Sequence, residues 1–291
     1  MKALYIHSAS SFIGDAGTDT SRLKEELNRY GCGSFRRVNR FILITMIGSR
    51  MCINGHVPGA NTAIYLTTDH GNLGDTVSVL DEIYAARSLP KPYNFINTMT
   101  NTAAFYLAQN LGTRGRNITV SSRHLSFERG LDLVATDIAA GQTDGALIGG
   151  VDVAFNSGHL MENRGDDRWK SVDGSGWFYI RPEPDGACAV FRENRIFQDG
   201  ASCLKWIQEK NASSVDMVAF GALISKEERV RWEEALSPVD RFDYLERYGY
   251  CGSATACGIG KFVESFKGRS LLHISRDRHG NHAVLEIEKF Q

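Results

Sequence analysis

The chain has 291 residues, of which 42% are hydrophobic and 23% are charged, as in an ordinary soluble globular protein. Its formal net charge of −1, and the lack of a Lys/Arg cluster with interleaved aromatic residues, argue against nucleic-acid binding. No apolar stretch approaches the roughly 20 residues of a membrane helix, so we expect no membrane contact.

The cysteines indicate neither a metal site nor a disulfide framework. None of the six forms a Cys-x-x-Cys pair or lies at zinc-ligand spacing from histidines: Cys32, Cys52, Cys188, Cys203, Cys251 and Cys257. We therefore expect no metal, no cofactor, and reduced thiols in a cytoplasmic protein. The N-terminal apolar run is too short for the core of a signal peptide and is typical of a first strand.

Short strand-like runs alternate with helical patterns along the chain, which indicates the α/β class. The expected strands are Ala3–His7, Thr62–Thr68, Ile118–Ser122, Ala146–Ile148, Ala187–Glu193, Val215–Leu223, Leu271–Ser275 and His282–Glu288, the last two forming a hairpin. The expected helices are Arg36–Met51, Gly71–Ala86, Thr102–Leu111, Leu125–Ala140, Lys226–Leu236 and one that starts at Gly258. Residues 156–182 show little periodicity and are predicted to form a loop region. With no linker or low-complexity segment, we expect a single domain over residues 1–291.

One stretch carries the most specific pattern. The strand-like run Asn117-Ile-Thr-Val-Ser-Ser-Arg-His124 leads into a helix, and the next strand is Thr143-Asp-Gly-Ala-Leu-Ile-Gly-Gly-Val-Asp152. This resembles the nucleophile segment of β-ketoacyl synthases, members of the thiolase superfamily. In that family a strand ends at a cysteine, a helix follows, and the next strand ends in a Gly-Gly turn. In an ungapped comparison, His124 takes the place of the cysteine.

Other stretches extend the resemblance, which is strongest over residues 90–155. They are Arg36–Arg40, Leu66–Gly71, Pro92–Gly115 and Asp185–Val190; after the third, Arg116 stands where the family has proline. The resemblance implies a thiolase-like layered αβαβα fold, shortened between Glu193 and Val215. It also implies two similar halves, of about residues 1–195 and 196–291, although no repeat is visible in the sequence.

The catalytic set of the resembled family is vacant or replaced. Ketosynthases use a Cys-His-His set, in which the thiolate holds the acyl chain and two imidazoles support decarboxylation of the malonyl unit. Gly221 occupies the place of the first histidine, and Thr255 lies nearest the place of the second. No histidine occurs between His159 and His273, so a register slip would not supply one. The resemblance therefore implies no catalytic residue, with degenerate positions at His124, Gly221 and Thr255.

Two residue types near the vacated site have alternative interpretations. His124 at a helix N-terminus is expected to stay neutral, because the helix dipole disfavours a protonated imidazole. It is either a packing and hydrogen-bonding residue in a sealed site or an aid to malonyl decarboxylation. Cys251 and Cys257 are either inert buried thiols or a displaced nucleophile.

A third segment is a candidate for binding the acyl chain. In ketosynthase dimers the corresponding segment reaches across the two-fold interface toward the partner's acyl pocket. Its residues here are Tyr93, Asn94, Phe95, Thr98, Met99 and Thr100. They either fill the core or form a wall that limits chain growth, because overlap repulsion at the end of a tunnel is steep.

The resemblance implies a chain-length-factor-like subunit that pairs with a catalytically complete ketosynthase and, through the complex, meets acyl carrier protein. The Leu-Thr-Thr-Asp-His-Gly71 motif is most similar to the ketosynthase-like partner subunits of aryl polyene pathways. The alternatives are a stand-alone malonyl-thioester decarboxylase or priming enzyme that uses His124, and a structural homodimer.

Overall fold

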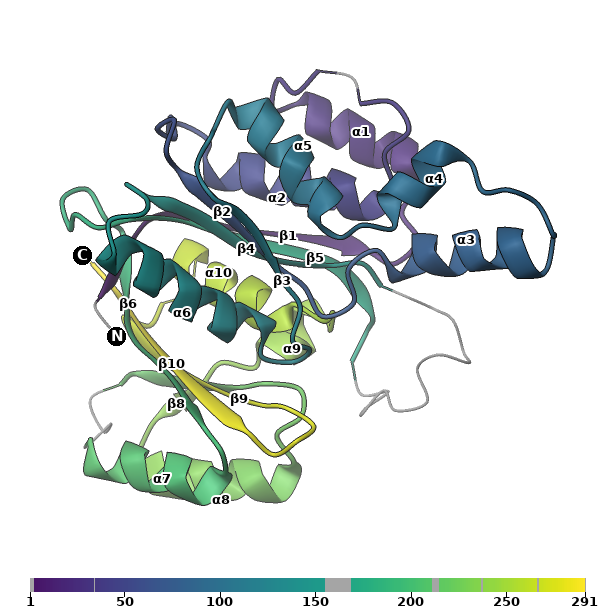
Figure 1. Ribbon diagram of the computed structural model, residues 1–291. Helices are drawn as coiled ribbons and strands as arrows, with labels where there is room; N and C mark the ends of the chain where they lie inside the picture. The colour runs from purple at the N-terminus through teal and green to yellow at the C-terminus, as the bar shows by residue number, and fades with distance from the viewer. Residues whose placement is uncertain are drawn as a thin grey trace.

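A ten-stranded sheet runs through the part of the chain that the structure describes (Figure 1). This computed structural model describes residues 3–33, 35–154, 169–210, 215–236, 238–265 and 267–290. The strands are β1 (Leu4–Asp15), β2 (Ala63–Thr67), β3 (Asn117–Val120), β4 (Ala146–Asp152), β5 (Val172–Arg181), β6 (Ala189–Phe197), β7 (Met217–Phe220), β8 (Asp240–Arg241), β9 (Ser270–Arg276) and β10 (His282–Lys289). Their order in the sheet is β3-β2-β4-β5-β1-β6-β10-β9-β7-β8.

This order contains the same arrangement twice. Numbered within each half, both sets of five strands follow the order 3-2-4-5-1, and the two sets join where β1 pairs with β6. Strand directions repeat as well, because β2 is parallel to β3 and β4, and β7 is parallel to β8 and β9. The second set begins with β6, which spans the division expected near residue 195.

Helices cover both halves of the sheet and also separate them. The helices are α1 (Thr20–Asn28), α2 (Arg40–Cys52), α3 (Leu73–Tyr84), α4 (Pro92–Asn97), α5 (Asn101–Leu111), α6 (Ser126–Ala139), α7 (Gly200–Glu209), α8 (Lys226–Leu236), α9 (Tyr244–Tyr248) and α10 (Ala254–Ser265). In Figure 1, α1, α2 and α5 lie over the first half, α6 and α10 lie centrally, and α7 and α8 lie beneath the second half.

Three hydrophobic cores fill the spaces between these layers. One packs α1, α2 and α5 against the first half of the sheet, and its large side chains include Phe41 and Trp177. The central core surrounds α6 and α10 and draws residues from both halves, such as Phe178 and Leu285. The third packs α7 and α8 against the second half, around Trp232. The layered αβαβα arrangement predicted from the sequence is therefore confirmed.

The loop predicted for residues 156–182 is wrong over Val172–Arg181, which form β5; residues 156–168 of that prediction lie outside the described residues. Nine of the ten β5 residues are buried, so the strand lacks the alternation that marks a half-exposed strand. Its loop-like residues have specific partners. Asp173 pairs with Arg40, and Gly174 and Gly176 lie where a Cβ would overlap the sulfur atom of Cys251 and the backbone of α10.

Local capping explains where several helices begin and end. The Asn39 side chain accepts a hydrogen bond from the Ile42 N–H at 2.8 Å and starts α2. The Asp199 side chain starts α7 in the same way. Gly112, with a φ of 68°, ends α5 in the left-handed conformation. Helices α1, α4, α7 and α9 were not predicted, and β1 is longer than expected. No helix of the described residues is long and apolar enough to cross a membrane.

Candidate functional site

A strained turn joins β3 to α6 and carries His124. Arg123 and His124 have φ values of 48° and 44°, a conformation that residues other than glycine seldom adopt. The Leu125 N–H turns back to the Arg123 carbonyl, and Ser126 then begins the helix. A tight strand-to-helix turn of this kind projects one side chain from the end of the sheet, as in nucleophile elbows. In this chain the projected side chain is an imidazole.

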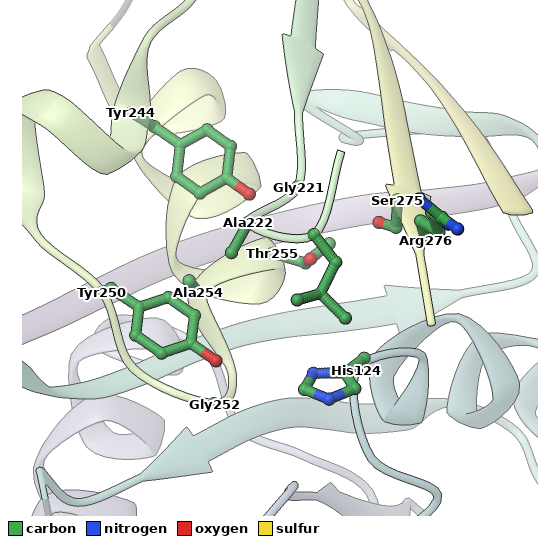
Figure 2. Close-up of a pocket in the computed structure, with 11 residues that line it drawn as sticks. His124, Gly221, Ala222, Tyr244, Tyr250, Gly252, Ala254, Thr255, Ser275 and Arg276 are labelled. Atoms are coloured by element: carbon green, nitrogen blue, oxygen red, sulfur yellow. The ribbon is translucent and has the colours of Figure 1, made fainter. Parts of the chain in front are cut away.

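A cavity of about 20 Å³ lies beside this turn. Its lining comes from several segments: His124 after β3, residues 221–223 after β7, Tyr244 on α9, Tyr250, Gly252, Ala254 and Thr255 around the start of α10, and Ser275 and Arg276 at the end of β9. Strands β3, β7 and β9 all contribute at their carboxyl ends, where α/β sheets commonly place their sites. The structure thus brings His124, Gly221 and Thr255 together (Figure 2).

His124 is neutral in this setting. Burial, helped by the charge of Arg278, lowers the pKa of its imidazole to about 4. Its backbone N–H donates to Asp69 Oδ2 at 2.7 Å, and its Nδ1 lies 3.6 Å from the same oxygen. Its Nε2 is buried and has no hydrogen-bond partner in the described structure. Burial, rather than the helix terminus expected from the sequence, is the main cause of the neutral state.

A polar cluster around Asp69, which accepts the His124 backbone N–H, holds the turn in place. Burial and the neighbouring Asp152 raise the pKa of Asp69 to about 7. Burial also opposes ionisation of Asp152. The hydrogen bond and charge of His70, together with hydrogen bonds from the Asp69 N–H and Ser253, outweigh this and lower the pKa of Asp152. The same contact with Asp152 raises the pKa of His70. The Ser253 hydroxyl, from the loop before α10, donates to Asp152 and ties that loop to the cluster.

The positions corresponding to the two histidines differ in character. Gly221 has little room for a side chain, because a Cβ there would lie 3.2 Å from the Cα of Ser275. Thr255 lies inside α10, whereas the loop before the helix contributes Tyr250. Figure 2 shows the hydroxyl groups of Tyr244 and Tyr250 directed into the same space as the His124 ring. Tyr250, which precedes the helix start, is the residue that the sequence comparison could have identified at this place.

The two candidate cysteines do not line the cavity. Cys251 and Cys257 are buried free thiols in the central core. Their mutual hydrogen bond, followed by burial, raises the pKa of Cys251 well above its ordinary value. A thiol in this state is a poor nucleophile, because the thiolate is the reactive form. The described residues also contain no group of three His, Cys, Asp or Glu side chains that could hold a metal ion.

The six candidate binding residues lie on or next to α4, and none of them lines the cavity. Four side chains contact their own chain: Tyr93 lies beneath the Arg37 guanidinium, Asn94 donates to Glu82, Thr98 donates to the Phe95 carbonyl, and Thr100 packs on Gly71. Phe95 and Met99 are different, since 58% and 48% of their surfaces are exposed.

These two residues belong to a set of exposed apolar residues on and between α3, α4 and α5, which we call the α3–α5 face. Its exposed members are Leu80, Ile83, Tyr84, Leu89, Phe95, Ile96, Met99 and Phe105. Strand β3 is an edge strand whose only partner in the described sheet is β2, so one row of its backbone groups is unpaired. Contiguous exposed apolar surface on a folded protein commonly marks an interaction site.

Comparisons with known proteins agree with this architecture. Residues 51–164 match the family model of the beta-ketoacyl synthase N-terminal domain, and no curated protein matches the sequence. A structure of the ishigamide ketosynthase/chain length factor superposes with a TM-score of 0.75 and 15% identity, covering 99% of this chain and 100% of that chain. The PfaC keto synthase–chain length factor gives 0.74 and 12%, covering 99% of this chain and 43% of that chain.

A third structure contains AntDE:AntF, a type II polyketide synthase acyl-carrier protein in complex with its ketosynthase bound to the hexaketide. It gives a TM-score of 0.72 and 13% identity, with full coverage of both chains. The chain is therefore ketosynthase-like, and the predicted thiolase-type fold is confirmed. Identities of 12–15% establish the fold, while the function must be argued from the site.

Proposed function

We propose that this chain is a non-catalytic, chain-length-factor-like subunit that pairs with a catalytic ketosynthase and shapes the shared acyl tunnel. The observation that carries the proposal is the small size of the cavity at the β3–α6 turn. A volume of about 20 Å³ suits a single water molecule, whereas sites for organic ligands span roughly 300–1,000 Å³. An acyl chain therefore has no place beside His124 in this conformation.

The chemistry of the cavity supports the same conclusion. No thiol lines it, so no acyl thioester can form there. The His124 N–H, which could stabilise an oxyanion at the turn, is already bound by the Asp69 carboxyl group. A side chain at Gly221 would require β9 to shift slightly, because its Cβ would lie 3.2 Å from the Cα of Ser275. In this proposal, loss of the nucleophile is accompanied by a site too small for substrate.

The surface supports a partner. Helix α5 contacts the edge strand β3, and exposed apolar residues and an unpaired strand edge are both features that a second protein would cover. Two of the similar structures are described as ketosynthase/chain length factor proteins, and one contains a ketosynthase with its acyl-carrier protein. In this proposal the partner performs all the covalent chemistry, and carrier protein delivers its substrates to the complex.

Within this proposal, Phe95 and Met99 are the wall residues best placed to meet a partner or an acyl chain, because they project outward. Thr98 and Thr100, whose side chains contact their own chain, set the shape of the wall and do not themselves project from it. We assign the complex to aryl polyene synthesis, in which an aryl-primed chain grows by malonyl units. This assignment rests on the Leu66–Gly71 motif.

The test is co-expression with the full-length ketosynthase encoded nearest to this chain, followed by mass measurement by light scattering. We expect a 1:1 heterodimer that Phe95→Asp and Met99→Asp break, because each places a charge in an apolar interface. The matched control is Val230→Asp, on α8 and 54% exposed, which should leave the heterodimer intact. A stable homodimer that ignores the ketosynthase would refute the proposal.

One observation favours a second candidate, a malonyl-thioester decarboxylase. A neutral His124 that carries its proton on Nε2, the nitrogen without a partner, would donate a hydrogen bond to the thioester carbonyl and stabilise the enolate that remains when carbon dioxide leaves. This function requires the cavity to open on binding. Purified chain would then release carbon dioxide from malonyl-carrier protein, and a His124→Ala variant would not. Inert purified chain would exclude this candidate.

A further inference from the structure

A second polar network adjoins the cavity, which two of its residues, Ser275 and Tyr244, line together with His124. It links α6, β9 and α9 through four hydrogen-bonded side chains, which we call the relay: Glu128, Ser275, His273 and Tyr244. The contacts are 2.6 Å from Ser275 Oγ to Glu128 Oε1, 3.2 Å from Ser275 Oγ to His273 Nδ1, and 3.0 Å from His273 Nε2 to Tyr244 OH. All four side chains are buried.

Glu128 and His273, the acid and the imidazole of the relay, are best satisfied in their neutral forms. Glu128 is buried with no ion-pair partner among the described residues, and its Oε2 has no hydrogen-bond partner. Burial raises its pKa to about 7, although the hydrogen bond with Ser275 acts in the opposite direction. Burial also lowers the pKa of His273 to about 3. An isolated buried charge on either residue would be costly.

The positions of the protons then follow from the contacts. An ionised Glu128 would accept the Ser275 hydroxyl proton, and a neutral Glu128 reverses this contact. Its acid proton would be an unpaired buried donor on Oε2, whereas on Oε1 it can be donated to Ser275. Ser275 must then donate its own proton to His273 Nδ1, which leaves the proton of the neutral ring on Nε2. That N–H donates to the Tyr244 hydroxyl, whose own proton is then free to be donated into the cavity that Tyr244 lines.

We propose that the relay is a one-directional chain of neutral hydrogen bonds that begins at a protonated Glu128 and ends at the cavity. There the Tyr244 hydroxyl presents a donor to one bound water molecule. Tyr244 and Thr255 line the cavity, and His124 Nε2 is the unpartnered acceptor on the same cavity (Figure 2). The cavity has room for one water molecule, which needs two or more polar partners and finds them in this donor and acceptor.

This inference goes beyond the subunit role and does not depend on it. The relay supplies hydrogen-bonding groups to the cavity without carrying a formal charge itself. Two carboxyl groups of raised pKa flank the site: Glu128 at the start of the relay, and Asp69, which accepts the His124 backbone N–H. We therefore describe the site as a proton-storing network in a protein that lacks the thiol of a condensing enzyme.

The first test is the tautomer of His273 in the unmodified chain at pH 6, read from two-bond nitrogen–proton correlations in NMR. The relay requires the proton on Nε2. A proton on Nδ1 would mean that Ser275 donates to an ionised Glu128, and would overturn the proposal.

The second test is infrared difference spectroscopy of the carboxylic acid carbonyl stretch. The band should be present at pH 6, be lost in Glu128→Gln, and shift in Ser275→Ala, which removes the acceptor of the acid proton. Asp69→Asn is the matched control, because it removes the other carboxyl group of raised pKa and should leave the Glu128 band in place. A spectrum that Glu128→Gln leaves unchanged would also overturn the proposal, whether or not the chain binds a ketosynthase.

Discussion

Replacement of Glu128 by glutamine should change how the stability of the protein depends on pH. Glu128 is fully buried, and burial raises its pKa from 4.5 to about 7. Between these values the folded state binds more protons than the unfolded state. The free energy of unfolding therefore falls as pH rises from 4.5 to 7, and the Glu128 contribution is constant above that range. Glutamine keeps the shape and one acceptor oxygen of the side chain but does not titrate.

The size of the effect follows from the shift. At about 1.4 kcal/mol per pKa unit, a change from 4.5 to about 7 corresponds to about 3 kcal/mol. The stability of Glu128→Gln relative to the parent chain should therefore increase by about 2–3 kcal/mol between pH 5 and pH 8. Asp69, whose pKa is also raised to about 7, gives the parent chain a slope of the same sign. This slope is present in both proteins and cancels in their difference.

The assay is urea unfolding of both proteins at half-unit pH intervals, followed by circular dichroism. The exposed Glu25, changed to Gln, serves as the matched control and should show the same pH profile as the parent chain. Parallel profiles for Glu128→Gln and the parent chain between pH 5 and pH 8 would refute the reasoning. They would mean that Glu128 is ionised when folded, or that it is reached by water.

Three further outcomes are expected. In a complex whose ketosynthase partner has lost its own cysteine, His124→Cys should give no condensation product by mass spectrometry; appreciable turnover would mean that the vacant positions were misassigned. Gly149→Ala would place a methyl group in overlap with the buried indole of Trp177 on β5, so we expect a loss of about 1–3 kcal/mol in urea unfolding, while Gly59→Ala, whose methyl group would make only an ordinary contact with Thr62, should have little effect. Arg40→Met would leave the fully buried Asp173 without its cation and should cost about 3–5 kcal/mol; an unchanged unfolding midpoint would contradict this.

Elements with a regular pattern and local end signals were predictable from the sequence. Helix α8 was predicted with the bounds that the structure has, and the closing hairpin of β9 and β10 was predicted within a few residues. In both cases the residues that define the element also adjoin each other in the chain. Local interactions of this kind do not require knowledge of distant partners.

Strand β5 was not predictable for the opposite reason. Its residues Asp173, Gly174 and Gly176 are typical of loops, and each fits the strand only because of a distant contact. Arg40 neutralises the carboxylate, and the two glycines leave space for a sulfur atom and for the backbone of α10. A sequence pattern shows that such residues are unfavourable in a strand. It does not show the distant partners that make them favourable here.

The candidate site was predictable in part. His124, Gly221 and Thr255 line one cavity, although their role as vacated catalytic positions stays a prediction. Tyr250 and the relay residue Glu128 were missed. A glutamate in the first turn of an amphipathic helix is normally exposed and favoured by the helix dipole, so the sequence gives no signal that this one is buried.

The repeated strand order explains why the site holds so many polar contacts. The cavity lies where the carboxyl ends of strands from both halves meet, so its walls belong to both. Hydrogen bonds join the halves there, between Ser253 and Asp152 and between Ser275 and Glu128. Each joins buried groups that would be left unsatisfied if the halves moved apart. Within the proposed function, selection for a stable pairing of the halves preserves this polar site after catalysis has been lost.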